Sequence, residues 1–556
     1  MTRYGSDDGR MRVSGWKAVL SVLIFAVIGF AACTMPDNPG AFHPMAFLRI
    51  PLEVPLLALA LLLLPRRMAV PVALLATTVV FCLLFLKSAD VGVLAAFQRR
   101  FNPYLDMKML FDGWNLLSGA VGNLGAALVI ALAAVTMTML VGAFWWASVR
   151  MTRLARPARR AAVAGFAIIF AAGLGLLAGG SRVGLKDVAE LRVTSYLGER
   201  LSLVVRSIAD IRRFEGELAG DKGFAGRDNL FARIRGRDVI LVFIESYGRS
   251  AIEDSRYGAL IKPRLQAIEG QLQAAGFSAA SGWTRSPTVG GLSWLAHGTL
   301  LSGLWVDSQA RYDLLMKSER ASLNRQFRDA GWRTAAVMPA ITMDWPEAAY
   351  FGYDQILASK DLGYRGKPFN WVTMPDQYTL SAFDRLAREP AHEAGKPVMA
   401  EIALISSHAP WTPVPKLIDW QAVGDGTAFN EQVASGDTPQ VVWADHDRVR
   451  RQYVETIDYT LETLGDYIAR FGRGAVFVVL GDHQPAALVT GPDASRSVPV
   501  HIVSTDRALV EGFAAEGFGV GMTPDPQGPE PSMDSLRERL IRQFSGWAGD
   551  VPTIGD

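Results

Sequence analysis

Polar side chains of metal-binding type follow three apolar runs of the chain, at the point where each run ends. Glu245 follows the first run, two serines and His408 end the second, and Asp482 and His483 follow the third. The runs are Val239–Ile244, Val398–Ile405 and Val476–Leu480. Ligands bind at the carboxyl ends of strands in open α/β sheets, so these residues should converge on one cleft. Two carboxylates and an imidazole suit a divalent cation such as Mn²⁺, Mg²⁺ or Zn²⁺.

A hydroxyl nucleophile is expected in segment 286–303, where Gly290 and Gly291 lead into a predicted helix. Ser293 lies at the start of that helix, and Thr288 lies before the glycines. A hydroxyl at a helix N-terminus is beside free N–H groups and the positive end of the dipole, which favours an alkoxide and an incoming phosphate or sulfate. Metal coordination would lower the hydroxyl pKa further. Both hydroxyls are candidates, and a glycine turn with an N-cap serine is the alternative without chemistry.

Three further polar residues can be interpreted in two ways each. His297 lies one helical turn after Ser293 on the same face, where it can contact substrate, assist proton transfer or be a partly buried helix histidine. Arg285 precedes the glycine turn and can pair with a phosphate or cap the loop. His446 stands between two aspartates, which is more typical of a solvated helix start than of a metal site.

The half of the chain that holds these residues has the pattern of an α/β domain. Near-continuous apolar strands separated by helices indicate a buried, mostly parallel sheet covered by helices. Besides the three runs above, the predicted strands are Thr334–Met338 and Val498–Val503, and the predicted helices are Ser322–Ala330 and Val454–Phe471. The catalytic domain is expected over residues 237–520, followed by a tail over 521–556 with one short helix at Ser535–Phe544.

The N-terminal part, residues 1–181, has the pattern of a transmembrane domain. Five stretches contain no Asp, Glu, Lys or Arg: Ala18–Pro36, Val54–Pro65, Met68–Leu86, Gly113–Val149 and Ala161–Ser181. A helix needs about 20 apolar residues to cross the hydrocarbon core of a bilayer. The second stretch is short, so the prediction is five spans, or four if that stretch only lies in the interface.

Basic residues predict the orientation of the chain in the membrane. With five spans, eleven Lys and Arg lie on the side of the N-terminus and five in the opposite loops. The excess places the N-terminus in the cytoplasm, and an odd number of spans places the large C-terminal domain outside it. The expected location is the bacterial inner membrane, with a periplasmic or otherwise extracytoplasmic catalytic domain. Residues 182–236 are interpreted as a connector whose Leu201–Ile211 forms an amphipathic helix on the membrane surface or on that domain.

Composition excludes several classes of protein. A chain of 556 residues is longer than a single core usually supports, so more than one domain is expected. A net charge of +2 excludes a polyanion binder driven by bulk charge, and 50% apolar residues exclude a disordered chain. The two cysteines, Cys33 and Cys82, lie in apolar runs, so neither a disulfide framework nor a CxxC metal site is expected.

The order of the motifs resembles the sulfatase/alkaline phosphatase superfamily. Glu245-Ser-Tyr, Gly-Gly-Leu-Ser293, Ser-Ser-His408 and Gly-Asp482-His483 occur in the order typical of its members, over most of Asp238–Asp506. Five spans before such a domain resemble lipoteichoic acid synthases, periplasmic glucan phosphoglycerol transferases and lipid A phosphoethanolamine transferases. Trp345, Tyr350–Asp354 and Pro375-Asp376 resemble motifs of the first of these groups.

The resemblance implies a role for each matched residue. It implies one metal ion held by Glu245, the nucleophile oxygen, Asp482 and His483, and Mn²⁺ is the preferred ion. It also implies that His408 contacts the phosphate and that Trp345 helps to form the headgroup pocket. Leu300-Leu301-Ser302-Gly303 is similar to the Leu-Leu-Thr-Gly of sulfatases, which puts Ser293 at the nucleophile position. Related transferases have threonine there, which keeps Thr288 as the alternative.

Departures from the family patterns narrow the implied activity. Formylglycine sulfatases need Pro or Ala two residues after the nucleophile and Arg four residues after it, where this chain has Leu295 and His297. The disulfides of phosphoethanolamine transferases cannot form in a domain without cysteine. Pro346-Glu347 replaces the Asn-Arg that follows the tryptophan in lipoteichoic acid synthases, which leaves the donor headgroup open.

The function implied is that of a membrane-bound phosphotransferase. Such an enzyme moves a phospho-headgroup, phosphoglycerol before phosphoethanolamine, from phosphatidylglycerol or phosphatidylethanolamine to a glycan or lipid through a covalent Ser293 intermediate. The chain is expected to act as a monomer and without nucleic acid. The alternatives are an extracytoplasmic phosphodiesterase or sulfatase-like hydrolase, and a sensor ectodomain without catalysis.

Overall fold

Two compact units make up the protein. The computed structural model describes residues 15–179, 189–220, 229–491 and 493–547. The first unit comprises Met1–Ala95 and Arg99–Ile208, and the second comprises Ala96–Gln98 and Ala209–Asp556.

Apolar helices dominate the first unit. They are α1 (Gly15–Thr34), α2 (Glu53–Leu63), α3 (Arg66–Phe97), α4 (Met107–Met151) and α5 (Arg156–Gly179). A two-stranded parallel pair, β1 (Ile50–Pro51) with β2 (Ala189–Glu190), also belongs to this unit. Phe25 of α1 stacks on Phe144 of α4 with ring centroids 5.1 Å apart. The helices therefore share one apolar core instead of standing as separate rods.

Four helices in the described part of the chain are long and apolar enough to cross a membrane, against the five predicted. They are Gly15–Thr34, Arg66–Phe97, Gly122–Met151 and Arg156–Ala178. The second predicted span forms α2, whose 11 residues extend about 16 Å, roughly half the thickness of a bilayer core. It stops where Leu64 becomes extended before Pro65. Four spans by length is the alternative that the sequence left open.

Within the predicted connector the structure describes a long helix, α6 (Arg192–Leu218), which contains the predicted Leu201–Ile211 segment. Phe214 of this helix is fully buried in the core of the second unit. The guanidinium of Arg311 donates to Asp210 at 2.6 Å. The C-terminal end of α6 thus packs within the second unit.

An eight-stranded sheet forms the centre of the second unit, in the order β10-β4-β9-β8-β3-β7-β5-β6. The strands are β3 (Asp238–Ile244), β4 (Ser278–Arg285), β5 (Arg333–Met338), β6 (Gln355–Ala358), β7 (Val398–Leu404), β8 (Ala475–Gly481), β9 (Ser497–Ser504) and β10 (Gly519–Val520). Pairs from β8 to β6 are parallel, whereas β9, β4 and β10 pair antiparallel. The predicted α/β fold with a mostly parallel sheet is confirmed.

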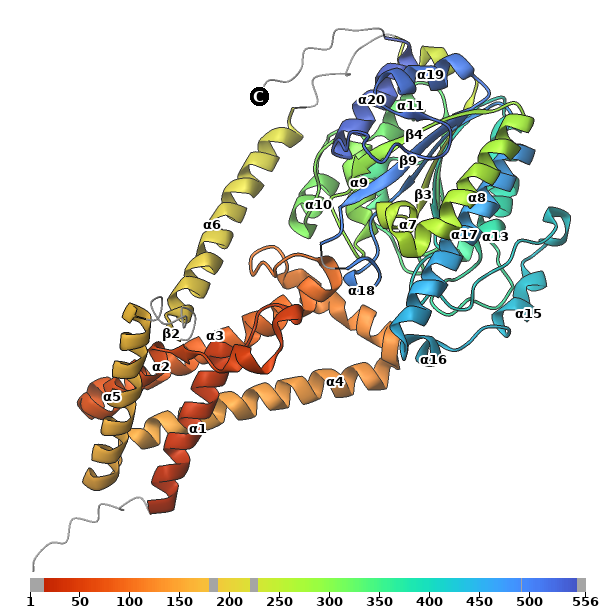
Figure 1. Ribbon diagram of the computed structural model, residues 1–556. Coiled ribbons are helices and arrows are strands. Elements are labelled where there is room, and N and C mark those ends of the chain that lie inside the picture. The colour runs from red at the N-terminus through yellow and green to blue at the C-terminus, as the bar shows by residue number, and fades with distance from the viewer. Residues whose placement is uncertain (1–14, 180–188, 221–228, 492, 548–556) are drawn as a thin grey trace, which may run out of the picture. The chain divides into compact units, whose positions relative to one another are not determined.

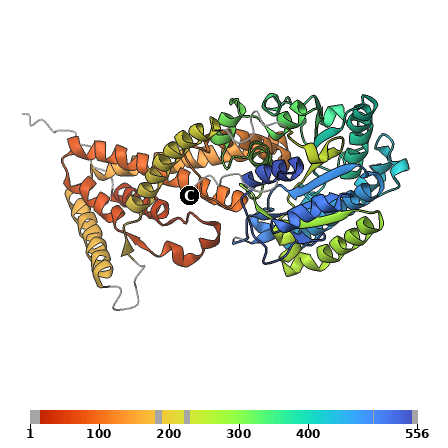
Figure 2. The same cartoon turned by 90° about the horizontal axis from the view of Figure 1, so that it is seen from above.

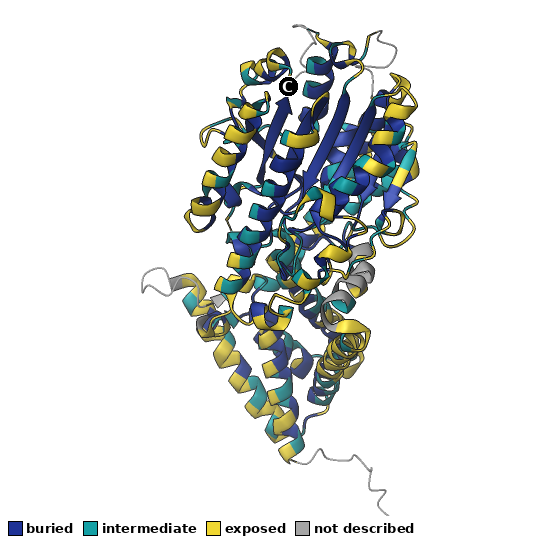
Figure 3. Ribbon diagram, turned by 90° about the vertical axis from the view of Figure 1, so that its right-hand side faces the viewer, coloured by how far each residue is buried: buried dark blue, intermediate teal, exposed yellow. Residues whose placement is uncertain are grey.

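Helices cover both faces of this sheet (Figures 1 and 2). One face carries α8 (Ser255–Ala274), α13 (Asp376–Phe383) and α17 (His446–Phe471); the other carries α9 (Ser293–Ser302), α10 (Gln309–Met316), α11 (Leu323–Asp329), α19 (Arg507–Ala515) and α20 (Asp534–Ser545). Shorter helices are α7 (Arg249–Glu253), α12 (Ala348–Phe351), α14 (Glu389–Glu393), α15 (Asn430–Val433), α16 (Pro439–Trp443) and α18 (Ala487–Thr490). The strands are buried between the two layers, and the helices turn their exposed faces outward (Figure 3).

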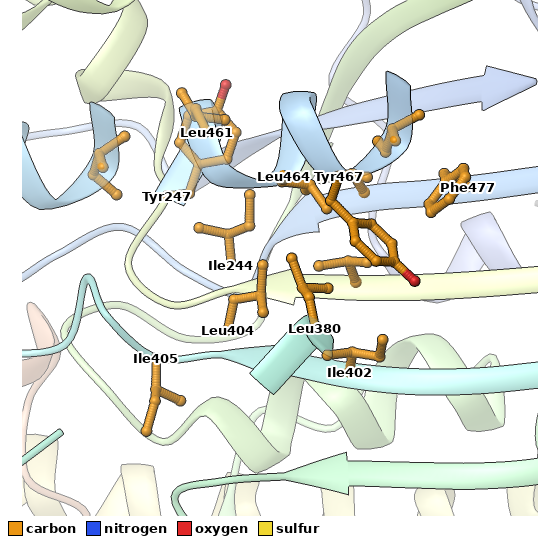
Figure 4. Packing of buried hydrophobic residues seen from close by; sticks show 14 of the residues in the cluster. Ile244, Tyr247, Leu380, Ile402, Leu404, Ile405, Leu461, Leu464, Tyr467 and Phe477 are labelled. Carbon is orange, nitrogen blue, oxygen red and sulfur yellow. The ribbon is translucent and has the colours of Figure 1, made fainter. Parts of the chain in front are cut away.

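Alternate residues of the central strands supply the two cores. Ile244 of β3 and Leu404 of β7 pack beneath Leu461 and Leu464 of α17 (Figure 4). On the opposite face, helix α20 of the predicted tail buries Phe544 with Phe513 of α19. The tail is therefore part of the domain core. With both faces covered, the carboxyl ends of β3, β7 and β8 form one edge at which polar residues can gather.

Candidate metal and nucleophile site

Four side chains from three segments meet at that edge of the sheet. Ser293 Oγ lies 3.1 Å from Glu245 Oε2 and 3.2 Å from His483 Nε2. His483 Nε2 is 3.3 Å from Glu245 Oε1 and 3.5 Å from Asp482 Oδ2. One ligand atom from each of Glu245, Asp482 and His483 lies within 4.8 Å of the others. The structure thus brings the predicted ligand set and the predicted nucleophile together.

The spacing and chemistry of these atoms fit a divalent cation. Protein ligands bind such ions at about 2.0–2.2 Å, so neighbouring ligand atoms of a tetrahedral site are about 3.4 Å apart. The spacings of 3.1–3.5 Å among the four side chains agree with that value. Two carboxylates, an imidazole and a hydroxyl are ligands that Mn²⁺, Mg²⁺ and Zn²⁺ accept.

Backbone contacts after β8 fix the orientation of Asp482 and His483. Asp482 Oδ1 accepts the N–H groups of Ser246 and His483 at 2.8 and 2.6 Å, which leaves Oδ2 for the cluster. His483 Nδ1 lies 2.8 Å from the carbonyl of Gln484, which can only accept, so Nδ1 carries a proton. A lone pair is then available at Nε2, on the side of the other ligands.

The glycine turn brings the start of α9 to the same loop. Gly290 has φ +74° and Gly291 has φ +142°, and the latter is a conformation that only glycine adopts readily. The N–H of Gly290 donates to the carbonyl of Gln484 at 2.8 Å, directly after His483. Leu292 has φ +64° and Ser293 begins the helix. This turn therefore joins the nucleophile to the metal ligands through the backbone.

Thr288, the alternative nucleophile, lies outside the cluster. Its side chain is buried, and its hydroxyl donates to the carbonyl of Gly291 at 2.7 Å. The hydroxyl of Ser286 donates to the carbonyl of Asp482 at 2.5 Å. Both hydroxyls stabilise the turn, and of the candidates only Ser293 contacts the ligand atoms.

His408 lies at the end of β7, on the same edge of the sheet. Its ring stacks on Trp371 with centroids 3.8 Å apart. Ser407, next to it, donates its hydroxyl to the carbonyl of Glu245 at 2.6 Å. The buried carboxylate of Asp376 accepts the N–H groups of Ile405 and Ser406 at 2.8 and 3.0 Å and so fixes the loop that carries His408.

The other predicted site residues have different surroundings. His297 is mostly buried, with Nδ1 2.5 Å from Glu401 Oε1. Trp345 packs on Phe351 and Tyr353, with centroids 5.9 and 6.1 Å away. The Arg285 side chain is exposed at the end of β4 and makes no contact with the cluster. His446 is exposed at the start of α17, capped by Asp445, as interpreted from the sequence.

Three polar or aromatic residues beside this site were missed from the sequence. Glu401 is the one charged residue inside the apolar run Val398–Ile405, and that was the available signal. Asp376 was noted only as part of a family motif, although it holds the end of β7. Trp371 stands at the tip of a tight turn between Phe369 and Val372, and nothing in the sequence places that turn over His408.

The two close carboxylates of the ligand set favour a bound proton or cation beside them. Burial and the neighbouring Glu245 charge raise the pKa of Asp482 to about 7. Burial opposes a charged His483, but Asp482 and Glu245 outweigh it and raise the pKa of this imidazole to about 9. Burial also opposes ionisation of Glu245, yet His483 and then His408 hold its pKa well below the usual range. The two neighbouring carboxylates of Glu245 and Asp482 are therefore stabilised by a positive charge beside them.

Metal affinity should therefore increase with pH. A cation displaces protons from Asp482, with a pKa of about 7, and from His483, with a pKa of about 9. Titration calorimetry with Mn²⁺ should give tighter binding at pH 9 than at pH 6, with protons released at pH 6. Equal affinity and no proton release over this range would contradict the assignment of these ligands.

One protein-family model matches part of the chain. Residues 237–497 match the protein-family model described as Sulfatase. This match covers slightly less than half of the chain and lies within the second unit. No curated protein sequence matches the chain significantly.

Solved structures similar to the chain include transferases and a hydrolase of low sequence identity. The lipoteichoic acid synthase LtaP from Listeria monocytogenes is 15% identical, with a TM-score of 0.34, over 53% of this chain and 70% of that one. The phosphoglycerol transferase GacH from Streptococcus pyogenes, in complex with sn-glycerol-1-phosphate, is 14% identical, with a TM-score of 0.36, over 61% and 92%. The phosphonate monoester hydrolase SpPMH from Silicibacter pomeroyi is 12% identical, with a TM-score of 0.33, over 56% and 73%.

Proposed function

We propose that the protein is a membrane-bound phosphotransferase that takes a phospho-headgroup from a phospholipid and passes it to an extracytoplasmic glycan or lipid. The observation that carries the proposal is the position of Ser293. Its hydroxyl is at the first residue of α9 and lies 3.1–3.2 Å from two atoms of the metal-ligand set. Phosphatidylglycerol is the preferred donor, and phosphatidylethanolamine is the second choice.

The site supports attack by a serine on a phosphodiester. A bound divalent cation would supply positive charge that lowers the hydroxyl pKa and balances charge on the phosphate. Glu245, Asp482 and His483 would hold it. Ser293 then attacks phosphorus, so that its Oγ–P bond forms while the bond to the diacylglycerol oxygen breaks. An acceptor hydroxyl takes the phospho-headgroup in a second displacement and frees Ser293.

Free backbone N–H groups at the start of α9 can bind a phosphate oxygen. His408 faces the same edge of the sheet, and stacking on Trp371 fixes its ring for contact with the phosphate. Trp345 packs on Tyr353, next to the His297–Glu401 pair, where it can line a headgroup pocket. The exposed Arg285 is a weaker candidate for substrate contact.

A lipid donor agrees with the apolar helices. Four helices long enough to span a bilayer precede the domain, and α2 adds a shorter apolar segment. The basic residues at the start of α3 and around the turn between α4 and α5 favour the cytoplasmic side for those ends. With these ends in the cytoplasm, α3, α4 and α5 make three crossings, and we propose that they leave the catalytic domain on the extracytoplasmic side, where nucleotide donors are scarce and phospholipid headgroups are abundant.

Purified full-length protein tests the donor directly. With Mn²⁺ and micelles of labelled lipid, it should release diacylglycerol faster from phosphatidylglycerol than from phosphatidylethanolamine. When an acceptor with free hydroxyl groups is added, more of the headgroup phosphate should be transferred to it and less should be released to water. Diacylglycerol release with all of the headgroup passing to water would instead favour a phosphodiesterase, and no release from either lipid would contradict the proposal.

A further inference from the structure

Glu401 places a carboxylate inside the core, in the middle of a central strand. β7 runs between β3 and β5, and Glu401 pairs in register with Leu241 on one side and Ala336 on the other. Its side chain is 1% exposed. An ionised carboxylate in such surroundings costs several kcal/mol unless it is paired and hydrogen-bonded.

Both oxygens of Glu401 are occupied. Oε1 lies 2.5 Å from His297 Nδ1, and Oε2 accepts the hydroxyl of Tyr353. Because a carboxylate only accepts, Nδ1 of His297 carries a proton. Burial and then the Glu401 charge hold the pKa of Tyr353 well above its usual value, so Tyr353 stays a donor. The opposite ring atom, Nε2, makes no hydrogen bond to any residue that the structure describes.

His297 is held beside the cluster by two further features. Its ring stacks on Phe243, two residues before Glu245, with centroids 3.8 Å apart and planes 20° apart. It also lies one turn after Ser293 in α9. About 12% of the side chain remains exposed, so this histidine is fixed in place but still accessible.

We propose that His297 is a catalytic proton shuttle and that Glu401 and Tyr353 are positioning residues behind it. This inference rests on the proposed transfer through Ser293. In the first half, the Ser293 alkoxide bonds to phosphorus, the bond to the diacylglycerol oxygen breaks, and Nε2–H of His297 gives its proton to that oxygen. In the second half, the acceptor hydroxyl gives its proton to Nε2 as its oxygen bonds to phosphorus and the bond to Ser293 breaks.

The arrangement is that of a carboxylate holding a histidine in one tautomer and stabilising its protonated form. Replacing Glu401 by Gln keeps the shape of the side chain and can still accept from Nδ1, but it removes the charge. A purely structural Glu401 would change thermal stability and affect every substrate alike. A shuttle would be needed only when the leaving oxygen requires a proton.

Substrates with different leaving groups separate these two roles. Bis(p-nitrophenyl) phosphate loses p-nitrophenolate, which departs as its anion, whereas a dialkyl diester loses an alkoxide that needs a proton. In full-length protein with Mn²⁺, Glu401→Gln and His297→Gln should slow the first cleavage of the dialkyl diester about 10²–10⁴-fold. Release of the first p-nitrophenolate should change by only a few-fold. Tyr353→Phe should act in the same direction with a smaller loss.

The chain offers a matched control at the other end of the sheet. Asp238 is also a buried carboxylate paired with a histidine, its Oδ1 lying 2.9 Å from His392 Nε2, but it starts β3 instead of facing the site. Asp238→Asn should lower stability and leave the ratio of the two rates unchanged. Equal losses on both substrates in Glu401→Gln, or full dialkyl activity in His297→Gln, would overturn the shuttle. A water-soluble dialkyl diester keeps the test valid if no phospholipid proves to be the donor.

Discussion

Ser293→Ala should reduce diacylglycerol release from the donor lipid by a factor on the order of 10⁴ or more. The variant removes the one of the two predicted nucleophiles, Ser293 and Thr288, whose hydroxyl contacts the ligand atoms. Rates measured on labelled lipid with saturating Mn²⁺ check this directly. The metal ligands are unchanged, so the variant should still bind Mn²⁺.

Two companion variants make the result specific to Ser293. Thr288→Ala deletes a hydroxyl that donates to Gly291, so it should lower stability by about 1 kcal/mol and keep most of the activity. Ser293→Thr keeps a hydroxyl at the start of α9 and should keep part of the activity. The assignment would be wrong if Ser293→Ala turned over normally while Thr288→Ala did not.

Asp482→Asn should abolish both Mn²⁺ binding and turnover in a protein that remains folded. The amide oxygen can still accept the N–H groups of Ser246 and His483, so the loop keeps its shape. The loss of activity should exceed the roughly 100-fold that changes behind a metal ligand cost, because a ligand itself is lost. Calorimetry and thermal unfolding with and without Mn²⁺ measure the two effects.

In the metal-free protein, the Asp482 carboxylate should destabilise the fold at high pH. Burial and Glu245 raise the pKa of Asp482 to about 7, so the folded state binds its proton more tightly than the unfolded state does. This group therefore contributes stability that is present below about pH 4 and is lost as pH rises through about 7. At pH 8 without metal, Asp482→Asn should be at least as stable as the wild type. Asp376 is another buried carboxylate at this edge, and the Asp376→Asn variant should keep the increase in Tm that Mn²⁺ causes. If that increase were absent from Asp376→Asn, the loss in Asp482→Asn would point to a general loosening of this edge of the sheet.

The sequence predicted the parts of the fold that depend on continuous apolar runs. Strands β3, β7 and β8 are buried on both faces, so each appears as a mainly apolar run, interrupted in β7 by Glu401, that stops near a polar residue. That pattern was enough to predict that Glu245, Asp482 and His483 gather at one edge. Strand β4, with the sequence Ser-Ala-Ala-Ser-Gly-Trp-Thr-Arg, lacks such a run and was not predicted.

Other features depend on contacts that no local pattern contains. α2 ends at Leu63 because Leu64 is extended before Pro65, and the apolar composition of its sequence does not show where it ends. Glu401 was counted within an apolar strand, whereas its partners His297 and Tyr353 are distant in sequence and meet it only in the folded domain. Arg285 lies next to the glycine turn in sequence, yet its side chain points to solvent.

Mapping the covalent intermediate tests the central claim most directly. Full-length protein mixed with phosphatidylglycerol and Mn²⁺ in the absence of acceptor, then quenched in acid, should gain the mass of one phosphoglycerol group. Fragmentation of the peptide that spans residues 286–303 should place this group on Ser293, and the adduct should be absent from Ser293→Ala. An adduct on Thr288, or turnover of the lipid by Ser293→Ala, would contradict the account.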